Sequence, residues 1–256
     1  MPQFLLITLA APLASFGEPA GHERRGSRER PGKSALTGLL GAALGIRRDD
    51  REKQRALATT LETGVRVDNP GHALQDFHTA QYIPTARIKQ PQTRRHALAA
   101  LRHSDNAELT KRDYRMDVLY TAAFARLENC PWTLEQMANA LRQPVFTLSL
   151  GRKSCPLSLP LHPRLIDAAN MLEALEKQAA PEKQAQRTLL QKAATKPGKH
   201  PYAALPVNAP TSRPTNRNNY RIERVNDQPL DRKGWHFTER REAVFTLDTA
   251  PGEEQS

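Results

Sequence analysis

The sequence predicts an α+β protein built on a ferredoxin-like β-α-β-β-α-β core. The order of the expected elements supports this prediction in two ways. The series strand, helix, strand occurs twice in residues 1–163, and residues 69–115 separate the two copies. The third observation is composition. At 256 residues and 38% hydrophobic residues, the chain has enough apolar side chains to bury a core, and its length allows one large domain or two small ones.

The first copy begins with residues 4–10, which read FLLITLA and are apolar on both faces, as expected of a central strand. A helix is expected to follow, with Ser34 as its N-cap. Its apolar positions fall on one helical face, namely Leu36, Leu39, Leu40, Ala43 and Leu44. Asp49 and Asp50 are typical of an ion-paired helix end, and residues 64–68 read as a short strand.

The second copy opens with a strand over residues 117–127. Thr133 and Gln136 then have the spacing of a capping box, which predicts the start of a second helix. Residues 145–150, which read VFTLSL, are predicted to be the last strand of the core. Residues 69–115 are too long for an ordinary loop, so they are expected to be a functional excursion or a small subdomain.

The composition changes after residue 163, so the sequence predicts a core over residues 1–163 and a less regular part over residues 164–256. This second part is expected to contain a helical segment, a Pro-rich linker and a last pair of strands, over residues 164–194, 197–219, 220–225 and 243–248.

Charge and cysteine content narrow the class of protein. The chain has 38 Lys and Arg against 27 Asp and Glu, a net charge of +11, which favours a polyanionic partner such as nucleic acid. Two cysteines exclude a disulfide scaffold and indicate a reduced, cytoplasmic protein. The apolar run at residues 4–14 is too short to span a bilayer, and no Lys or Arg precedes Arg24, so neither a membrane span nor a signal peptide is expected.

The segment HERRGSRERPGKS, residues 22–34, has the features of a phosphate-binding loop. Its glycines and five cations lead into a predicted helix start, where free amides favour an anion; the cations are Arg24, Arg25, Arg28, Arg30 and Lys33. The alternative is a solvated charge run. The loop does not fit a Walker A motif, because Gly26 is one position too far from Gly32, and ATP use is therefore not expected.

Two further segments are candidates for RNA contact. Residues 150–156 end a predicted strand in a basic turn that contains Arg152, Lys153 and Ser154, although a plain surface hairpin has the same pattern. Residues 75–82 carry aromatic side chains that suit stacking on bases, and the same side chains would also suit a small core of the insertion. They are Phe77, His78 and Tyr82.

Catalytic and metal motifs are not found. The eight histidines include no HExxH pair, and no G-x-S-x-G is present, so neither a metal nor another cofactor is expected. One enzymatic alternative stays open, a metal-independent endoribonuclease that uses general acid–base chemistry. Its candidate groups are His78 or His103 together with Tyr114 or Lys111.

Four segments together resemble a known family. They are FLLITLAAPLASFG at 4–17, GKSALTGLLGAALGIRRDD at 32–50, DFHT at 76–79 and LGRKSCPLSLPL at 150–161. They are similar to the CasD subunits of type I-E CRISPR Cascade complexes, which belong to the RAMP superfamily. Residues 226–245 resemble the last segment of the family more loosely.

The resemblance implies an RRM-related ferredoxin-like core with residues 69–115 as an inserted β-hairpin thumb. It implies a non-catalytic subunit that caps the 5′ handle of a guide RNA, contacts the backbone and large subunits of Cascade, and has no small-molecule substrate. The implied RNA contacts lie at or beside the loop and the basic turn of the family, at Arg24, Arg25, Arg28, Lys33, Ser34, Arg152, Lys153 and Ser154. The implied thumb residues are His78, Tyr82, Arg87, Lys89, Arg94 and Arg95.

Two other readings of the chain remain. One is the endoribonuclease, which would process precursor guide RNA, and the other is a general single-stranded RNA-binding module outside any CRISPR complex. Cleavage of a repeat-containing RNA by the purified chain would identify the first, and absence of the chain from a multi-subunit particle would identify the second.

Overall fold

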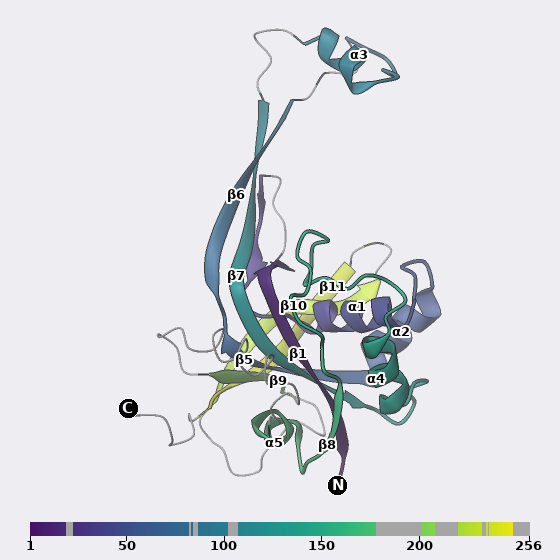
Figure 1. Cartoon of the computed structure of the whole chain (residues 1–256), viewed down its shortest axis with the longest axis vertical. Coiled ribbons are helices and arrows are strands. Elements are labelled where there is room, and N and C mark those ends of the chain that lie inside the picture. Colours follow the sequence, from purple (N-terminus) through teal and green to yellow (C-terminus); the bar gives the residue numbers. More distant parts are fainter. Residues whose placement is uncertain are drawn as a thin grey trace.

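The chain forms a mixed α/β fold dominated by one large, mainly antiparallel sheet (Figure 1). The computed structural model describes residues 1–18, 23–81, 83, 87–101, 107–177, 201–207, 220–231, 234 and 236–247. The helices are α1 (Lys33–Ala43), α2 (Arg51–Thr60), α3 (Arg94–Ala99), α4 (Leu134–Arg142) and α5 (Met171–Glu176). In the described part of the chain, no helix has the length and apolar character needed to cross a membrane.

The large sheet has nine strands and follows the order β10-β11-β9-β5-β7-β1-β8, with β3 and β6 pairing to β7 beside this path. The small strands β2 and β4 pair with each other. The strands are β1 (Gln3–Ala14), β2 (Phe16–Gly17), β3 (Arg24–Arg25), β4 (Ser27–Arg28), β5 (Leu61–Asn69), β6 (His72–Gln81), β7 (Ala107–Arg126), β8 (Arg164–Asp167), β9 (Tyr202–Pro206), β10 (Tyr220–Asp231) and β11 (His236–Thr246).

The strand β1 lies between β7 and β8 and is buried on both faces, which confirms the predicted central strand. Leu5, Ile7 and Leu9 point to a core cluster shared with α1 and α4. Phe4 and Leu6 point to a second cluster, shared with α5, β9 and β11. The period of two along a strand thus places successive side chains in two separate cores.

Helix boundaries differ from those expected around α1 and α2. Gly32, not Ser34, is the N-cap of α1. The carboxylate of Asp50 accepts the Lys53 N–H at 3.1 Å, so this acidic residue begins a helix instead of ending one. The sequence analysis missed α2 because it buries little more than Leu57 and Ala58 and therefore lacks a clear apolar stripe.

The strand predicted at residues 145–150 is wrong. The backbone N–H groups of Val145 and Phe146 bind carbonyls at the end of α1, and both side chains are exposed. The only pairing in the segment is an isolated bridge from Ser149 to Pro156. The strand that follows α4 in the sheet is instead β8, which pairs with β1. The capping box of Thr133 and Gln136 at the start of α4 is confirmed.

The C-terminal part is more regular than expected. Residues 164–167 form a strand, so the helical reading of 164–194 is wrong there, and α5 is the helix in its described portion. The expected linker contains β9, which pairs with β5 and β11. The predicted final strand pair is confirmed, and β10 and β11 are longer than expected. The domain division at residue 163 stays a prediction, while the sheet itself extends across that residue.

The insertion forms a long hairpin. β6 pairs with the first half of β7 from His72 opposite Met116 to Gln81 opposite Ala107, and the ribbon projects away from the sheet with α3 near its tip (Figure 1). Most side chains of β6 are exposed, and neither core cluster includes a residue of β6 or α3. The hairpin is therefore supported mainly by its own ladder of hydrogen bonds and by the continuity of β7 with the sheet.

We expect the core to fold without the hairpin tip. Because Gln81 faces Ala107, an Asn-Gly dipeptide can replace residues 82–106 as a two-residue turn. The midpoint of thermal unfolding, followed by circular dichroism, should stay within about 2 °C of that of the full chain, because no core contact is removed. Loss of the cooperative transition in the shortened chain would show that the tip belongs to the core.

Candidate nucleic-acid interface

The short strand β3 places two predicted RNA contacts at the base of the long hairpin. β3 runs parallel to β7, with Arg24 opposite Lys111 and Arg25 opposite Arg112. The Arg24 guanidinium donates to the Asp113 carboxylate at 2.9 Å, and this is an exposed pair. Two distant parts of the chain thus bring four cations together beside one acceptor carboxylate.

The basic turn after residue 150 lies against the same strand. The guanidinium of Arg152 stacks 4.5 Å from the centre of the Tyr114 ring and donates to the Arg25 carbonyl at 3.2 Å. The aromatic face and the carbonyl together fix the direction of Arg152. Lys153 and Ser154 follow in the turn and are exposed. The two basic segments that the sequence singled out therefore meet in space.

A groove with a volume of about 1050 Å³ lies where these segments meet. One wall is the face of α1 that carries Ser34, Ala35 and Gly38, whose small side chains let a ligand come close to the helix. Arg25 and Arg152 line the groove as its cations. The other lining residues come from the segment between β1 and α1, from α1 itself, from the residues around the basic turn and from the hairpin of β10 and β11. They are Ser15–Glu18, Gly26, Leu39, Ala42, Thr147, Ser149, Gly151, Asn226, Asp227 and Phe237–Glu239.

A carboxylate occupies the start of α1, where the sequence analysis expected amides free for a phosphate. The Lys33 N–H donates to Oδ2 of Asp227 at 2.6 Å, and the Leu36 N–H binds the Gly32 carbonyl. A Cβ built on Gly32 would lie 1.9 Å from the same Oδ2, so the close approach of Asp227 requires glycine there. The expectation of free amides at the helix start is therefore wrong for the Lys33 amide, because the chain supplies its own anion.

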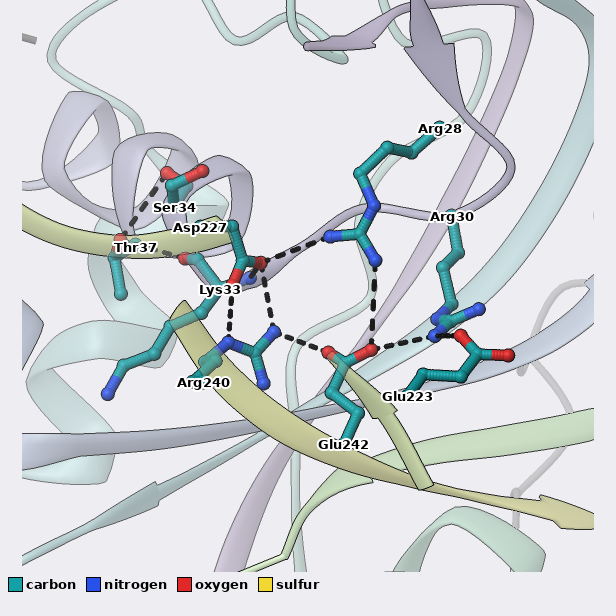
Figure 2. A network of polar contacts seen from close by, with 9 residues as sticks. All are labelled: Arg28, Arg30, Lys33, Ser34, Thr37, Glu223, Asp227, Arg240 and Glu242. Carbon is teal, nitrogen blue, oxygen red and sulfur yellow. Dashed lines mark hydrogen bonds and ion pairs between the residues drawn. The ribbon is translucent and has the colours of Figure 1, made fainter. Parts of the chain in front are cut away.

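Asp227 also organises a buried ionic network (Figure 2). Arg240 grips both oxygens of the Asp227 carboxylate and also donates to Glu242. Arg28 lies 3.5 Å from Asp227 and 3.9 Å from Glu242. The guanidinium of Arg28, which the sequence analysis assigned to RNA, is thus directed at two internal carboxylates.

Arg30 completes the network from the loop side. Its side chain is buried, and Nη2 donates to Glu223 at 2.6 Å and to Glu242 at 2.7 Å. Burial disfavours the charged form of Glu242, but Arg240 and Arg30 outweigh that effect and lower the pKa of its carboxyl. The network therefore ties the loop before α1 to β10 and β11 through charges that are paired inside the protein.

Lys33 points away from the groove. Its side chain lines a second cavity, of about 410 Å³, that also contains Glu62 and Arg240. Burial and the nearby Arg240 charge lower the pKa of the Lys33 amine to about 8. Ser34, one residue later, lines the groove itself. Adjacent residues that the sequence analysis placed in one site thus face two different cavities.

The residues assigned to the hairpin are spread along it. Nε2 of His78 lies 3.2 Å from the Asp76 carboxylate. Phe77 is 56% exposed, so it does not form a core of the insertion. Tyr82 and His103 lie outside the described residues. The remaining assigned residues are exposed cations on or before α3, namely Arg87, Lys89, Arg94 and Arg95.

The candidate groups for RNA cleavage do not converge. Lys111 pairs with Phe77, so it lies on one face of the ribbon, and His78 lies on the other. Tyr114 shares the face of His78, but its partner Leu74 is four residues from His78, which separates the two groups by about 13 Å. Tyr114 is also buried beneath Arg152. These three side chains do not form a shared acid–base site.

Metal ligands and reactive thiols do not gather in the described part of the chain. It contains no group of three or more His, Cys, Asp or Glu side chains able to hold a metal ion. Cys130 and Cys155 are both buried and unpaired. Burial raises the pKa of the Cys155 thiol, which keeps it in the unreactive protonated form.

Sequence reasoning missed two kinds of residue near the site. One is Arg112, which reaches the site through pairing with β3, as does Lys111, a residue that the sequence analysis considered only for RNA cleavage. The other is the set of network residues on β10 and β11, namely Glu223, Asp227, Arg240 and Glu242. Only Glu223 of this set falls within a predicted strand, residues 220–225, so a charge at an inward strand position could have indicated a buried partner for that residue alone.

Known proteins resemble this chain in sequence and in fold. The chain matches the family described as "CRISPR-associated protein (Cas_Cas5)" over residues 4–242. It is 30% identical over 183 residues to the CRISPR system Cascade subunit CasD of Escherichia coli (strain K12), and the alignment covers 68% of this chain and 76% of the relative. The resemblance to CasD subunits that the sequence motifs indicated is therefore confirmed.

Two solved structures share the fold. A chain from a "CRISPR RNA-guided surveillance complex" superimposes with a TM-score of 0.63 at 24% identity, covering 98% of this chain and 95% of the other. A second, described as "Crystal structure of Cas protein", gives a TM-score of 0.58 at 26% identity, covering 95% of each chain.

We expect Arg240→Met to destabilise the protein by about 3–5 kcal/mol, because it leaves two buried carboxylates without their main partner. The matched control is Arg224→Met, which removes an exposed pair with Glu239 at 3.8 Å and should cost at most about 1 kcal/mol. Urea unfolding of both variants measures the difference. Equal losses would mean that the network does not hold the hairpin of β10 and β11 to the loop.

Proposed function

Because the chain belongs to the Cas5 family of CRISPR-associated proteins, we propose that it is a Cascade subunit that caps the 5′ handle of the guide RNA. The observation that carries this proposal is the groove, because its walls bring Arg25 and Arg152 together from the two basic segments that the family resemblance singled out. Such a subunit supports antiviral defence by holding the guide, while base pairing reads the target sequence.

The groove suits single-stranded RNA. Arg25 and Arg152 provide cations for phosphates, and the face of α1 at Ser34 and Gly38 offers room for an unstacked base. A handle of fixed sequence can be held by phosphate contacts that set its register and by a few base contacts. Arg24, Lys153 and Ser154 extend the contacts outside the groove, because all three are exposed next to it.

Arg28 and Lys33 act differently in this proposal. Arg28 is held by Asp227 and Glu242, and Lys33 lines the second cavity. Both residues therefore support the loop that presents Arg24 and Arg25 and make no phosphate contact of their own.

The long hairpin is the proposed thumb, which contacts the neighbouring backbone subunit. Its length and exposure support this role, since β6 buries little surface within the chain. The contact residues would be His78, Tyr82, Arg87, Lys89, Arg94 and Arg95. The large subunit would dock on the body of the protein, near the handle.

The ferredoxin-like core of this proposal is made of β1, α1, β5, β7, α4 and β8. Its support is the strand order β5-β7-β1-β8, in which every neighbouring pair is antiparallel. The helices α1 and α4 share one core cluster with these strands. In this arrangement β8 takes the place that the sequence analysis gave to residues 145–150.

The proposed role is non-catalytic. General acid–base cleavage of RNA requires a base and an acid held near one phosphate. His78, Lys111 and Tyr114 lie on different faces or far apart along the ribbon, which supports binding without cleavage.

We expect the double variant Arg25→Ala, Lys153→Ala to bind a single-stranded repeat RNA more weakly. Neither side chain makes an ion pair within the described residues, so the fold should be unaffected. Because each lost phosphate contact lowers the dependence of log K on log salt by about 0.7, the slope should fall by about 1.4. Filter binding at several salt concentrations measures this slope.

The matched control is Arg47→Ala, Lys53→Ala, which removes the same charge at the start of α2, away from the groove. The control should keep the wild-type slope. If the two double variants changed the slope equally, general charge and not the groove would account for binding.

We also expect the purified chain to bind a repeat RNA without shortening it, both in a chelator and with divalent metal, because His78, Lys111 and Tyr114 do not form an acid–base pair. Denaturing gels of end-labelled RNA measure this. Site-specific cleavage that disappears in His78→Ala or Lys111→Ala would contradict the non-catalytic role and support the endoribonuclease alternative.

A further inference from the structure

A second basic surface lies on α2, at the opposite side of the molecule from the hairpin of β6 and β7 (Figure 1). A cavity of about 460 Å³ separates α2 from the end of β10. Its lining residues are Arg48, Arg51, Gln54, Arg55, Ala58, Thr59, Gln228, Pro229, Leu230 and Asp231. None of them lines the RNA groove, so the two sites are separate.

The cations of this surface share one helical face. Arg51 and Arg55 are one turn apart on α2, and both are exposed. Within the described residues, neither forms an ion pair with a carboxylate. Asp231 is the one acidic residue among the lining side chains. The lining therefore carries three arginines and one carboxylate.

The opposite wall of the cavity, at the end of β10, carries two apolar side chains beside Gln228 and Asp231. Leu230 is 66% exposed, and Pro229 lies beside it at the end of β10. An exposed leucine of this kind gains free energy when another apolar side chain covers it. A phosphate backbone would pair with the arginines but would leave Leu230 in water.

We propose that the face formed by Arg51, Arg55 and Leu230 is a docking site for an acidic protein segment with an apolar side chain. The occupant carries carboxylates that pair with the two arginines and places its apolar side chain on Leu230. The opposite charges make the contact specific, and the apolar contact on Leu230 buries apolar surface at the centre of the interface. This inference rests on the proposed function, because the segment belongs to another protein subunit of the same particle.

The test compares a charge reversal on the proposed face with one outside the cavity. Arg51→Glu, Arg55→Glu reverses the proposed face, and Arg47→Glu, Lys53→Glu makes the same charge change away from the cavity. Glu at position 51 lies in the first turn of α2, where a negative charge is favourable, so the helix should persist. Leu230→Ser tests the apolar half alone.

Each variant is co-expressed with the other subunits and a guide RNA, and the particle is purified through a tag on this chain. Native mass spectrometry should show that Arg51→Glu, Arg55→Glu lowers the occupancy of one protein subunit about tenfold. Leu230→Ser should lower the occupancy of the same subunit less, and the control should keep the full composition. RNA affinity of the isolated variants should equal that of the wild type.

Two results would overturn the inference. A full particle with Arg51→Glu, Arg55→Glu would exclude this face as a docking site. Loss of RNA affinity by the isolated variant would identify nucleic acid, not protein, as the occupant. Failure of the wild-type chain to enter any particle with RNA would instead contradict the proposed function, and the docking site with it.

Discussion

The carboxylate of Asp227 at the start of α1 is the interaction on which the arrangement of the site depends. It accepts hydrogen bonds from the first helical amide, that of Lys33, and from the guanidinium of Arg240. One side chain therefore joins the C-terminal hairpin of β10 and β11 to the helix. Arg30 makes a second connection through Glu242. Because all of these groups are largely removed from water, breaking one pair leaves an uncompensated charge, and the connection is therefore rigid. The hairpin that it holds forms one side of the groove proposed for RNA.

This network also divides the basic residues of the chain into two sets. Arg28, Arg30 and Arg240 are paired inside the protein and shape the loop. Arg25 and Lys153 form no such ion pair with the residues that the structure describes, and both are exposed beside the groove. A net charge of +11 therefore does not measure the cations available to RNA, because part of the positive charge has a structural role. The internal carboxylate takes the place at the helix end that an external phosphate would otherwise favour.

The sequence pattern predicted those helices and strands that depend on neighbouring residues. The apolar run at residues 4–10 predicted the central strand, and Thr133 with Gln136 predicted the start of α4, because burial on both faces and capping are visible in neighbouring residues. The strand predicted at 145–150 was wrong because its amides bind the end of α1, which is far away in sequence. The basic loop was recognised, but the pairing of Arg30 with β10 and β11 joins residues 193 and 212 positions apart, and no local pattern encodes those contacts.

Under the proposed function, the groove between α1, the basic turn after residue 150 and the hairpin of β10 and β11 holds the 5′ end of a guide RNA. Photo-crosslinking tests it most directly: RNA labelled with 4-thiouridine is co-purified with the particle and irradiated, and the attached peptides are mapped by mass spectrometry. We expect nucleotides at a uniform 5′ end to crosslink to residues 15–18, 25–26, 34–42 and 147–154. Crosslinks of that 5′ end to α2 or to the tip of the hairpin of β6 and β7, with none in the groove, would mean that the handle is held elsewhere.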